Sequence, residues 1–152
     1  MGNIFNADFR DFIQSLNDNE VEYILVGGYS VILHGHSRTT GDMDIWVGKT
    51  VGNYKKIAKA FKQFKMPLFD MTEDNFLRNP VFDVFVFGKP PVSIEILTNV
   101  KGLEFEGAYS NSECREVEGL KVQLIHFDDL LKAKRSAGRN RDVDDIENLS
   151  GK

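Results

Sequence analysis

Cysteine is almost absent from this chain of 152 residues, which contains Cys114 alone. A single cysteine excludes an internal disulfide, so we expect a reducing compartment, the cytoplasm, and a buried or chemically idle thiol. Long apolar runs are also missing, because no stretch approaches the roughly 18 residues that a membrane span needs. The opening residues, MGNIFNADFRDF, lack a basic segment followed by an apolar one. We therefore expect no secretory signal and no membrane association.

A surplus of positive charge is missing as well, since 19 lysines and arginines stand against 23 aspartates and glutamates and the formal net charge is -4. This balance excludes a protein that holds nucleic acid through a generally basic surface. Two local basic groups remain. The lysines between residues 55 and 65 follow a helical period and should form a solvated helix face. The second group lies between residues 132 and 141 and could take part in binding.

The hydrophobic pattern predicts a single α+β domain, residues 1–152, that ends in a pair of helices. Apolar residues at helical spacing predict helices, and short β-prone runs predict strands. The expected helices cover residues 5–17, 29–33, 52–64, 127–134 and 143–149. The expected strands cover residues 22–26, 43–47, 81–87, 92–97 and 117–125, the last as edge strands interrupted at Gly119.

Two aspartates, Asp42 and Asp44, stand at the mouth of the expected strand 43–47. In a strand, residues i and i+2 point to the same face and lie about 6–7 Å apart, so both carboxylates can converge on one or two cations. Oxygen ligands of this kind favour Mg²⁺ or Mn²⁺. A D-x-D tripeptide alone also occurs at turns and charged strand ends. Here the pair opens an apolar strand, where mutual repulsion and lost solvation are costs that a bound cation would offset.

Gly27 and Gly28 follow one expected strand and precede a short helix. Backbone amides at such a turn can bind phosphate, and glycine lets the phosphate approach closely. The alternative is a tight turn with no ligand. Because only 13 residues separate Gly28 from Asp42, the two features together predict a nucleoside-triphosphate site, with amides for the phosphate oxygens and metal ions to bridge them.

Two-metal phosphoryl transfer requires another carboxylate from a neighbouring strand. In the expected strand 92–97, Ser93 and Glu95 share the face opposite the apolar residues, so Glu95 is our candidate. Asp83, in the preceding strand, is the rival. Either residue could instead be a charge at a strand edge that is turned to solvent.

Three blocks of the sequence together resemble the polymerase-beta-like nucleotidyltransferase superfamily, and in particular small bacterial proteins related to the AbiEii nucleotidyltransferases of toxin-antitoxin and phage-defence systems. The first block is LVGGYSVILHGHSRTTGDMDIWV, with a glycine pair, a short helix, an Arg-x-Thr and the D-x-D. The second is IEILT around Glu95, although close relatives often have aspartate there. The third is DDLLKAKRSAGRNRDVDDIENL. The blocks occur in the family's order and cover most of the chain.

The resemblance implies a nucleotidyltransferase fold, a mixed twisted β-sheet with flanking helices, and Mg²⁺ held by Asp42, Asp44 and Glu95. It also implies that a nucleoside triphosphate is bound by the following residues: Gly27, Gly28, Ser30, Arg38, Lys134 and Arg139. Lys134 would act as a point charge and Arg139 as a fork for phosphate, and Arg38 would brace the loop or contact phosphate. An alternative for Lys134 and Arg139 is a helix end at which cations favour the dipole and Gly138 is the cap. We expect His34 and His36 to serve loop structure.

These features predict a metal-dependent nucleotidyltransferase that moves a nucleoside monophosphate to an acceptor hydroxyl on RNA, protein or a small molecule such as an antibiotic. An antitoxin-type protein is a conceivable partner from the same resemblance. A non-catalytic module that binds a nucleotide or a partner is the alternative, against which the intact carboxylates weigh. A glycosyltransferase, which also uses a D-x-D, fits poorly because the chain is short and carries the upstream glycine pair.

Overall fold

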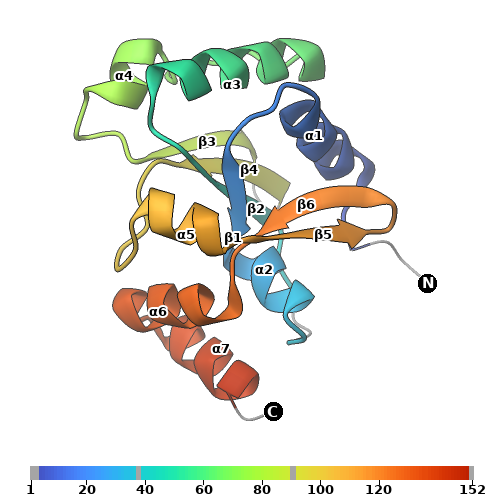
Figure 1. Cartoon of the computed structure of the whole chain (residues 1–152), viewed down its shortest axis with the longest axis vertical. Helices are drawn as coiled ribbons and strands as arrows, with labels where there is room; N and C mark the ends of the chain where they lie inside the picture. Colours follow the sequence, from blue (N-terminus) through green and yellow to red (C-terminus); the bar gives the residue numbers. More distant parts are fainter. Residues whose placement is uncertain (1–3, 37–38, 90–91, 151–152) are drawn as a thin grey trace.

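The computed structural model describes residues 4–36, 39–89 and 92–150, which build a six-stranded sheet with helices on both faces (Figure 1). The strands, in chain order, are β1 (Tyr23–Val26), β2 (Asp42–Val47), β3 (Val84–Lys89), β4 (Val92–Leu97), β5 (Glu113–Val117) and β6 (Leu120–Leu124). The helices are α1 (Ala7–Asp18), α2 (Gly27–Leu33), α3 (Val51–Phe64), α4 (Glu73–Leu77), α5 (Phe105–Asn111), α6 (Phe127–Ala137) and α7 (Asn140–Ser150).

The sheet has the order β3-β4-β2-β1-β6-β5 and is mixed. The pairs β2–β4 and β1–β6 are parallel, whereas β1–β2, β3–β4 and β5–β6 are antiparallel. The prediction of a mixed sheet with flanking helices is therefore confirmed. The prediction that residues 117–125 form edge strands is wrong for β6, because β6 pairs with β1 on one side and with β5 on the other.

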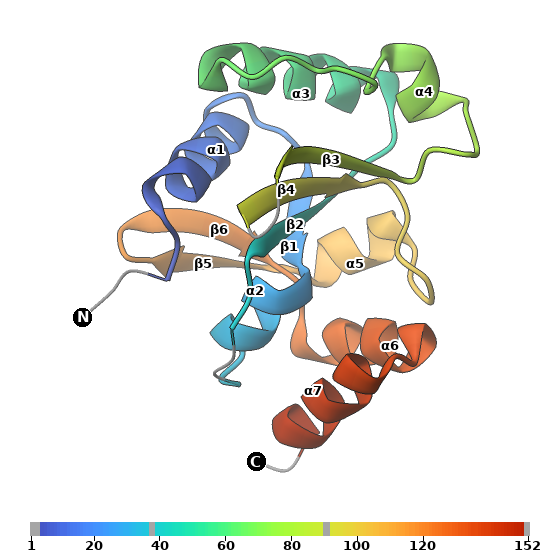
Figure 2. The same ribbon diagram turned by 180° about the vertical axis from the view of Figure 1, so that it is seen from behind.

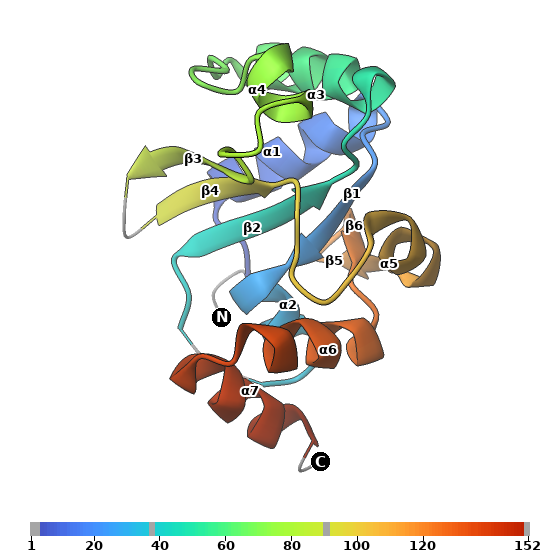
Figure 3. The ribbon, with the colours of Figure 1, turned by 90° about the vertical axis from the view of Figure 1, so that its left-hand side faces the viewer.

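Helices α1, α3 and α4 cover one face of the sheet, and α6 and α7 lie on the other side beside α2 (Figures 2 and 3). Aromatic contacts join the first layer to the sheet. The Phe12 ring on α1 meets Phe61 of α3 edge to face at 5.6 Å, and Phe61 meets Phe87 of β3 at 4.9 Å. Side chains alternate along strands, so the residues next to Phe87 in the sequence face the opposite side, where the candidate site lies.

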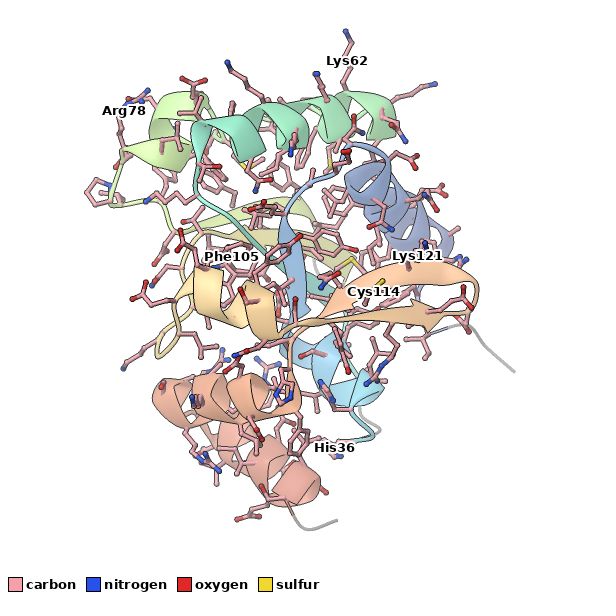
Figure 4. The ribbon with its side chains drawn as sticks, viewed as in Figure 1. His36, Lys62, Arg78, Phe105, Cys114 and Lys121 are labelled. Atoms are coloured by element: carbon pink, nitrogen blue, oxygen red, sulfur yellow. The ribbon has the colours of Figure 1, made fainter. Side chains whose placement is uncertain are left out.

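Local signals account for most helix ends. The Asn6 side chain accepts a hydrogen bond from the Phe9 N–H, and the Thr50 side chain accepts one from Asn53, which caps α1 and α3. Gly138 ends α6 in the left-handed conformation, as the sequence predicts for a C-cap. The exposed lysines of α3 form a solvated face, and Lys62 points away from the body of the molecule in Figure 4.

Two helices and part of a strand were not expected from the sequence. Helices α4 and α5 have 5 and 7 residues, which is too short for a clear helical period. Strand β5 begins at Glu113 instead of near Val117. The loop between the last two helices is also shorter than expected, because α6 continues through Ala137 and α7 begins at Asn140.

Two further expectations concern the surface. None of the helices formed by the described residues has the length and apolar character needed to cross a membrane. Cys114 lies on β5 and is exposed (Figure 4). Of the two expected alternatives, a buried thiol is therefore wrong, and a chemically idle thiol stays a prediction. Cys114 is exposed because β5 is an edge strand whose outward residues face solvent.

Candidate active site

Strands β2 and β4 bring three carboxylates to one face of the sheet. Asp42 and Asp44 are two residues apart on β2, and in the parallel pair they stand opposite Ser93 and Glu95 of β4. The Ser93 hydroxyl donates a hydrogen bond of 2.7 Å to Asp42 Oδ1, which fixes the orientation of that carboxylate. The sequence prediction that Glu95 would lie next to the two aspartates agrees with this geometry.

The carboxylates line a pocket of about 130 Å³ whose walls are almost entirely polar. The lining residues are Gly27, Gly28, Thr40, Asp42, Asp44, Glu95, Lys134, Arg139 and Arg141. The pocket thus joins the start of α2, strands β2 and β4 and the α6–α7 pair. Three carboxylates and three cationic side chains in so small a volume are an arrangement suited to metal ions and to the phosphates they bind.

Burial and like charge make the ionised form of Asp44 costly. Burial raises the pKa of Asp44 to about 7, and the negative charges of Glu95 and Asp42 add to the shift, while Lys134 and Arg141 oppose it. The pKa of Glu95 is raised by burial first, then by the charge of Asp42 and a hydrogen bond to it. A cation between these groups would remove the repulsion.

Gly27 makes room for Asp44. Its φ of 69° lies in the left-handed region, and a Cβ at this position would overlap the Asp44 carboxylate. A side chain here would therefore strain the backbone and displace a site carboxylate. The sequence predicted a phosphate-binding role for the Gly27-Gly28 pair, but it gave no sign of this close contact across the sheet.

Two other residues expected to bind nucleotide are placed differently. Ser30 is fully buried, and its hydroxyl donates a hydrogen bond of 2.6 Å to the Gly27 carbonyl, so it braces the turn. It is not among the residues that line the pocket. Arg38 falls outside the described residues.

Lys134 lies at the centre of a buried ionic cluster. Its Nζ is 3.1 Å from Asp142 Oδ1 and 3.1 Å from Asp145 Oδ2, which joins α6 to α7. Both aspartates are almost completely buried. Both aspartates belong to the third block of the sequence, whose pattern alone gives neither of them a partner.

Arg139 is held by the same carboxylate. Its Nε donates to Asp142 Oδ2 at 2.6 Å, although 62% of its side chain is exposed. Burial alone would raise the pKa of Asp142, but the hydrogen bonds from Arg139 and Lys134 outweigh it and the pKa is lowered. Asp142 is thus ionised and fixes both expected phosphate-binding side chains at the pocket wall.

Arg141 and Thr40 also line the pocket, and neither was among the expected ligands. Arg141 belongs to the basic group between residues 132 and 141, and Thr40 ends the Arg-x-Thr run, so the sequence carried a weak signal for each. Arg141 is exposed. Its positive charge partly opposes the rise in the pKa of both Asp44 and Glu95. It is a cation directed at the site.

Asp83, the rival of Glu95, lies outside the pocket. It is exposed and stands at a bend just before β3, where its backbone carbonyl accepts a hydrogen bond from the Thr98 N–H at 3.0 Å. Side chains alternate along a strand, and the register of β2 and β4 places Glu95 opposite Asp44. Asp83 precedes β3 and has no position opposite either aspartate.

A second group of potential metal ligands consists of His36, Asp144 and Asp145, whose donor atoms lie within 4.8 Å of one another. His36 follows α2 and lies near the C-terminal helices (Figure 4). The Asp145 carboxylate of this group also pairs with Lys134, whose Nζ lies 3.1 Å from Asp145 Oδ2.

A second hollow, of about 140 Å³, adjoins the polar pocket and shares Gly27, Asp44, Lys134 and Arg139 with it. Its remaining walls are mostly apolar and come from β4, the segment after it and α6. They include Leu97, Val100, Leu130, Ala133 and Ala137. The polar pocket, which suits charged groups, thus lies next to an apolar slot, the hollow of about 140 Å³, which suits a flat or aliphatic group.

Solved structures share this fold, a mixed sheet with flanking helices. One is a candidate nucleotidyltransferase from Thermotoga maritima, with a TM-score of 0.56 and 14% identity over 94% of this chain and 90% of that one. Another is an antigenic nucleotidyltransferase-like protein from Paracoccidioides brasiliensis, with a TM-score of 0.55 and 17% identity over 92% of this chain and 72% of that one. Identities this low establish the fold alone.

The family is established by the sequence itself. Residues 6–152 match the model of the family described as "Nucleotidyl transferase of unknown function (DUF2204)", and the chain belongs to this family. Comparison with curated proteins gives no match.

Proposed function

We propose that this chain transfers a nucleoside monophosphate from a nucleoside triphosphate to an acceptor hydroxyl, with release of pyrophosphate. The observation that carries the proposal is the convergence of Asp42, Asp44 and Glu95 on one face of adjacent strands, inside a pocket that also contains cationic side chains. Membership of a nucleotidyl transferase family agrees with this chemistry.

The three carboxylates fit a divalent cation such as Mg²⁺ or Mn²⁺. Their oxygens are hard ligands. The pKa of Asp44 is raised by burial first and then by the charges of Glu95 and Asp42, and a bound cation would offset both effects. When bound, the metal would neutralise phosphate charge and stabilise the leaving pyrophosphate. Asp42, already oriented by Ser93, and Asp44, backed by Gly27, would be its principal ligands, with Glu95 completing the set.

The triphosphate would lie along the start of α2 and the α6–α7 junction. Gly28 and Gly27 line the pocket without side chains, so phosphate oxygens can reach the backbone. Arg141 and Arg139 would bind phosphate from the opposite wall, and Lys134 would contribute charge from its buried position. The adjoining apolar slot, with Leu97 and Leu130 in its walls, is the place for the base.

In the transfer itself, the acceptor oxygen forms a bond to the α-phosphorus while the bond between that phosphorus and the bridging oxygen of pyrophosphate breaks. The proton of the acceptor hydroxyl moves to Glu95, whose raised pKa makes it a better base near neutral pH than an ordinary carboxylate. Glu95 lies on the side of the pocket toward β3, where the sheet is open, so the acceptor would approach from there.

The acceptor class and biological role belong to the same proposal. We take RNA, protein and small molecules, antibiotics included, as the candidate acceptors. The AbiEii-like blocks support a role in defence with an antitoxin-type protein as partner. The exposed and unpaired Cys114 fits a reducing compartment such as the cytoplasm.

The test is transfer of label from triphosphates carrying ³²P at the α-phosphate to components of a cell extract, with and without Mg²⁺. We expect a labelled product that disappears in Glu95→Gln and Asp44→Asn and persists in Asp83→Asn, a matched change outside the pocket. Label that persists in the first two variants would refute the assignment. Tight nucleotide binding with no transfer to any extract would favour the non-catalytic module instead.

A further inference from the structure

The apolar slot beside the polar pocket has an outer end that borders the loop after β4. At its inner end the slot shares Asp44, Lys134 and Arg139 with the pocket, so a nucleotide whose triphosphate lies in the pocket would extend its base along the slot. Lys101, in the loop between β4 and α5, borders the slot but not the pocket. Lys101 is therefore placed to meet the edge of the base that points away from the phosphates.

The loop that carries Lys101 is held against α6. The Leu103 N–H donates a hydrogen bond of 3.2 Å to the Val100 carbonyl, which closes a tight turn. Gly102 has a φ of 92°, and a Cβ at this position would overlap the Ser136 side chain of α6. Figure 3 shows the loop reaching from β4 to α6 before it returns to α5. The turn thus holds the backbone of Lys101 beside the slot.

Lys101 also supplies a polar side chain that this end of the slot otherwise lacks. Apart from the residues shared with the pocket, the side chains that line the slot are apolar except for Lys101 and Asp142. Both oxygens of Asp142 already accept hydrogen bonds from Lys134 and Arg139. Within the part of the chain that the structure describes, the Lys101 ammonium has neither a hydrogen bond nor an ion pair. Its donors are available to a bound base.

An ammonium donates hydrogen bonds and accepts none, so it distinguishes between the groups on the edge of a base. Guanine carries the acceptors O6 and N7 on one edge, and uracil, like thymine, carries O4 there, whereas adenine and cytosine carry an amino group at the corresponding position. We propose that Lys101 makes the slot select nucleoside triphosphates whose base carries a keto oxygen at this position, GTP and UTP, over ATP and CTP. The inference rests on the proposed function, which places the base in the slot, and it names the class of nucleotide that the slot takes.

The expected preference is moderate for two reasons. Lys101 is exposed, so water competes for its ammonium. Adenine keeps the N7 acceptor beside its amino group, so the ammonium still finds one partner on ATP. The apolar walls, Leu97 and Leu130 among them, contact the faces of any base and do not favour one base over another. We therefore expect about fivefold tighter binding of a keto purine than of an amino purine.

Isothermal titration of the full chain with inosine triphosphate and with ATP, in the presence of Mg²⁺, isolates this contact. The two nucleotides share one purine frame, and inosine has a keto oxygen where adenine has its amino group. We expect the wild type to bind inosine triphosphate about fivefold more tightly than ATP. Lys101→Met should bring the two affinities together, and Lys101→Glu, which offers acceptors, should invert the preference. Lys132→Met removes an exposed cation of α6 outside the slot and, as the matched control, should keep the wild-type preference.

The ratio of the two dissociation constants cancels the effect of a lost positive charge on the triphosphate, which both nucleotides carry, and circular dichroism would verify that each variant is folded. Equal affinities in the wild type, or a preference that survives Lys101→Met, would overturn the inference and leave the proposed transfer standing. A preference that Lys132→Met lowers as much as Lys101→Met does would overturn it as well. A preference for inosine triphosphate without any transfer would support the inference and count against the transfer. A wild type that binds neither nucleotide would overturn both.

Discussion

Asp44 of β2 and Glu95 of β4 stand directly opposite each other in a parallel strand pair, so two carboxylates that are 51 positions apart in the chain project side by side from one face of the sheet. Two like charges repel each other, so neither carboxylate stabilises the other. The arrangement therefore costs folding free energy, which is characteristic of a functional site and not of a structural ion pair.

The first prediction concerns stability and pH. The pKa of Asp44 is raised to about 7 in the folded chain, above its ordinary value of 3.8, so the folded state holds its proton more tightly than the unfolded state. The metal-free protein should therefore lose stability as pH rises from about 4 to about 7, and the loss should be complete above that range. Asp44→Asn should raise the free energy of unfolding at pH 8 by roughly 2–4 kcal/mol.

Denaturant unfolding at pH 5 and pH 8, without divalent metal, measures this effect. The difference between wild type and Asp44→Asn should be small at the lower pH and large at the higher one. An Asp44→Asn variant that is less stable than wild type at pH 8 would show that the carboxylate is stabilised in the fold by something other than a cation.

Metal binding should be pH-dependent for the same reason. A cation must displace the proton of Asp44 below about pH 7, so the apparent affinity for Mg²⁺ should fall by about tenfold for each pH unit below that value. Isothermal titration in buffers of different ionisation enthalpy would count the protons released. Affinity that stays constant from pH 5 to pH 8 would place the metal away from Asp44.

Gly27→Ala should impair both the fold and the site. The added Cβ would overlap the Asp44 carboxylate, and φ at this residue is unfavourable for alanine. We expect a loss of about 1–3 kcal/mol in stability and loss of metal-dependent activity. Gly52→Ala is the control, since nothing lies within 4 Å of a Cβ at Gly52, in the first turn of α3, and alanine is a better helix former than glycine. A Gly27→Ala variant with normal activity would contradict the close contact described here.

Substitutions of Lys134 and Arg141 should distinguish a residue that stabilises the fold from one that binds substrate. Lys134→Met would leave Asp142 and Asp145 without their buried cation, and we expect a loss of about 3–5 kcal/mol in stability. Arg141→Ala removes an exposed cation from the pocket, so it should raise KM for the triphosphate several-fold with little change in stability. Thermal unfolding and steady-state kinetics distinguish the two. An Arg141→Ala variant with unchanged KM would remove it from the nucleotide site.

Much of the fold and part of the site followed from local patterns. The alternation of side chains along residues 92–97 was enough to prefer Glu95 to Asp83, and the glycine pair marked the point where β1 ends and α2 begins. Apolar residues at helical spacing placed both ends of α1 and α3 to within two residues. These features depend on residues that are neighbours in the sequence, so the sequence of this chain alone was enough to predict them.

The remaining features depend on contacts between distant segments. The space that Gly27 leaves for Asp44 exists only because β1 and β2 pair, and the burial of Asp142 beside Lys134 requires α7 to fold back on α6. Short helices such as α4 have too few turns to show a period. Ser30 looked like a ligand because of its position in a motif, yet its hydroxyl is used by the turn itself.

Titration with Mn²⁺, followed by electron paramagnetic resonance of the free ion, tests most directly whether the three carboxylates form a metal site. Wild type and Asp83→Asn should bind the ion equally, Asp42→Asn and Glu95→Gln should bind it at least about tenfold more weakly, and Asp44→Asn should bind it weakest. Binding that is the same in Asp44→Asn as in wild type would contradict the metal site proposed at Asp42, Asp44 and Glu95.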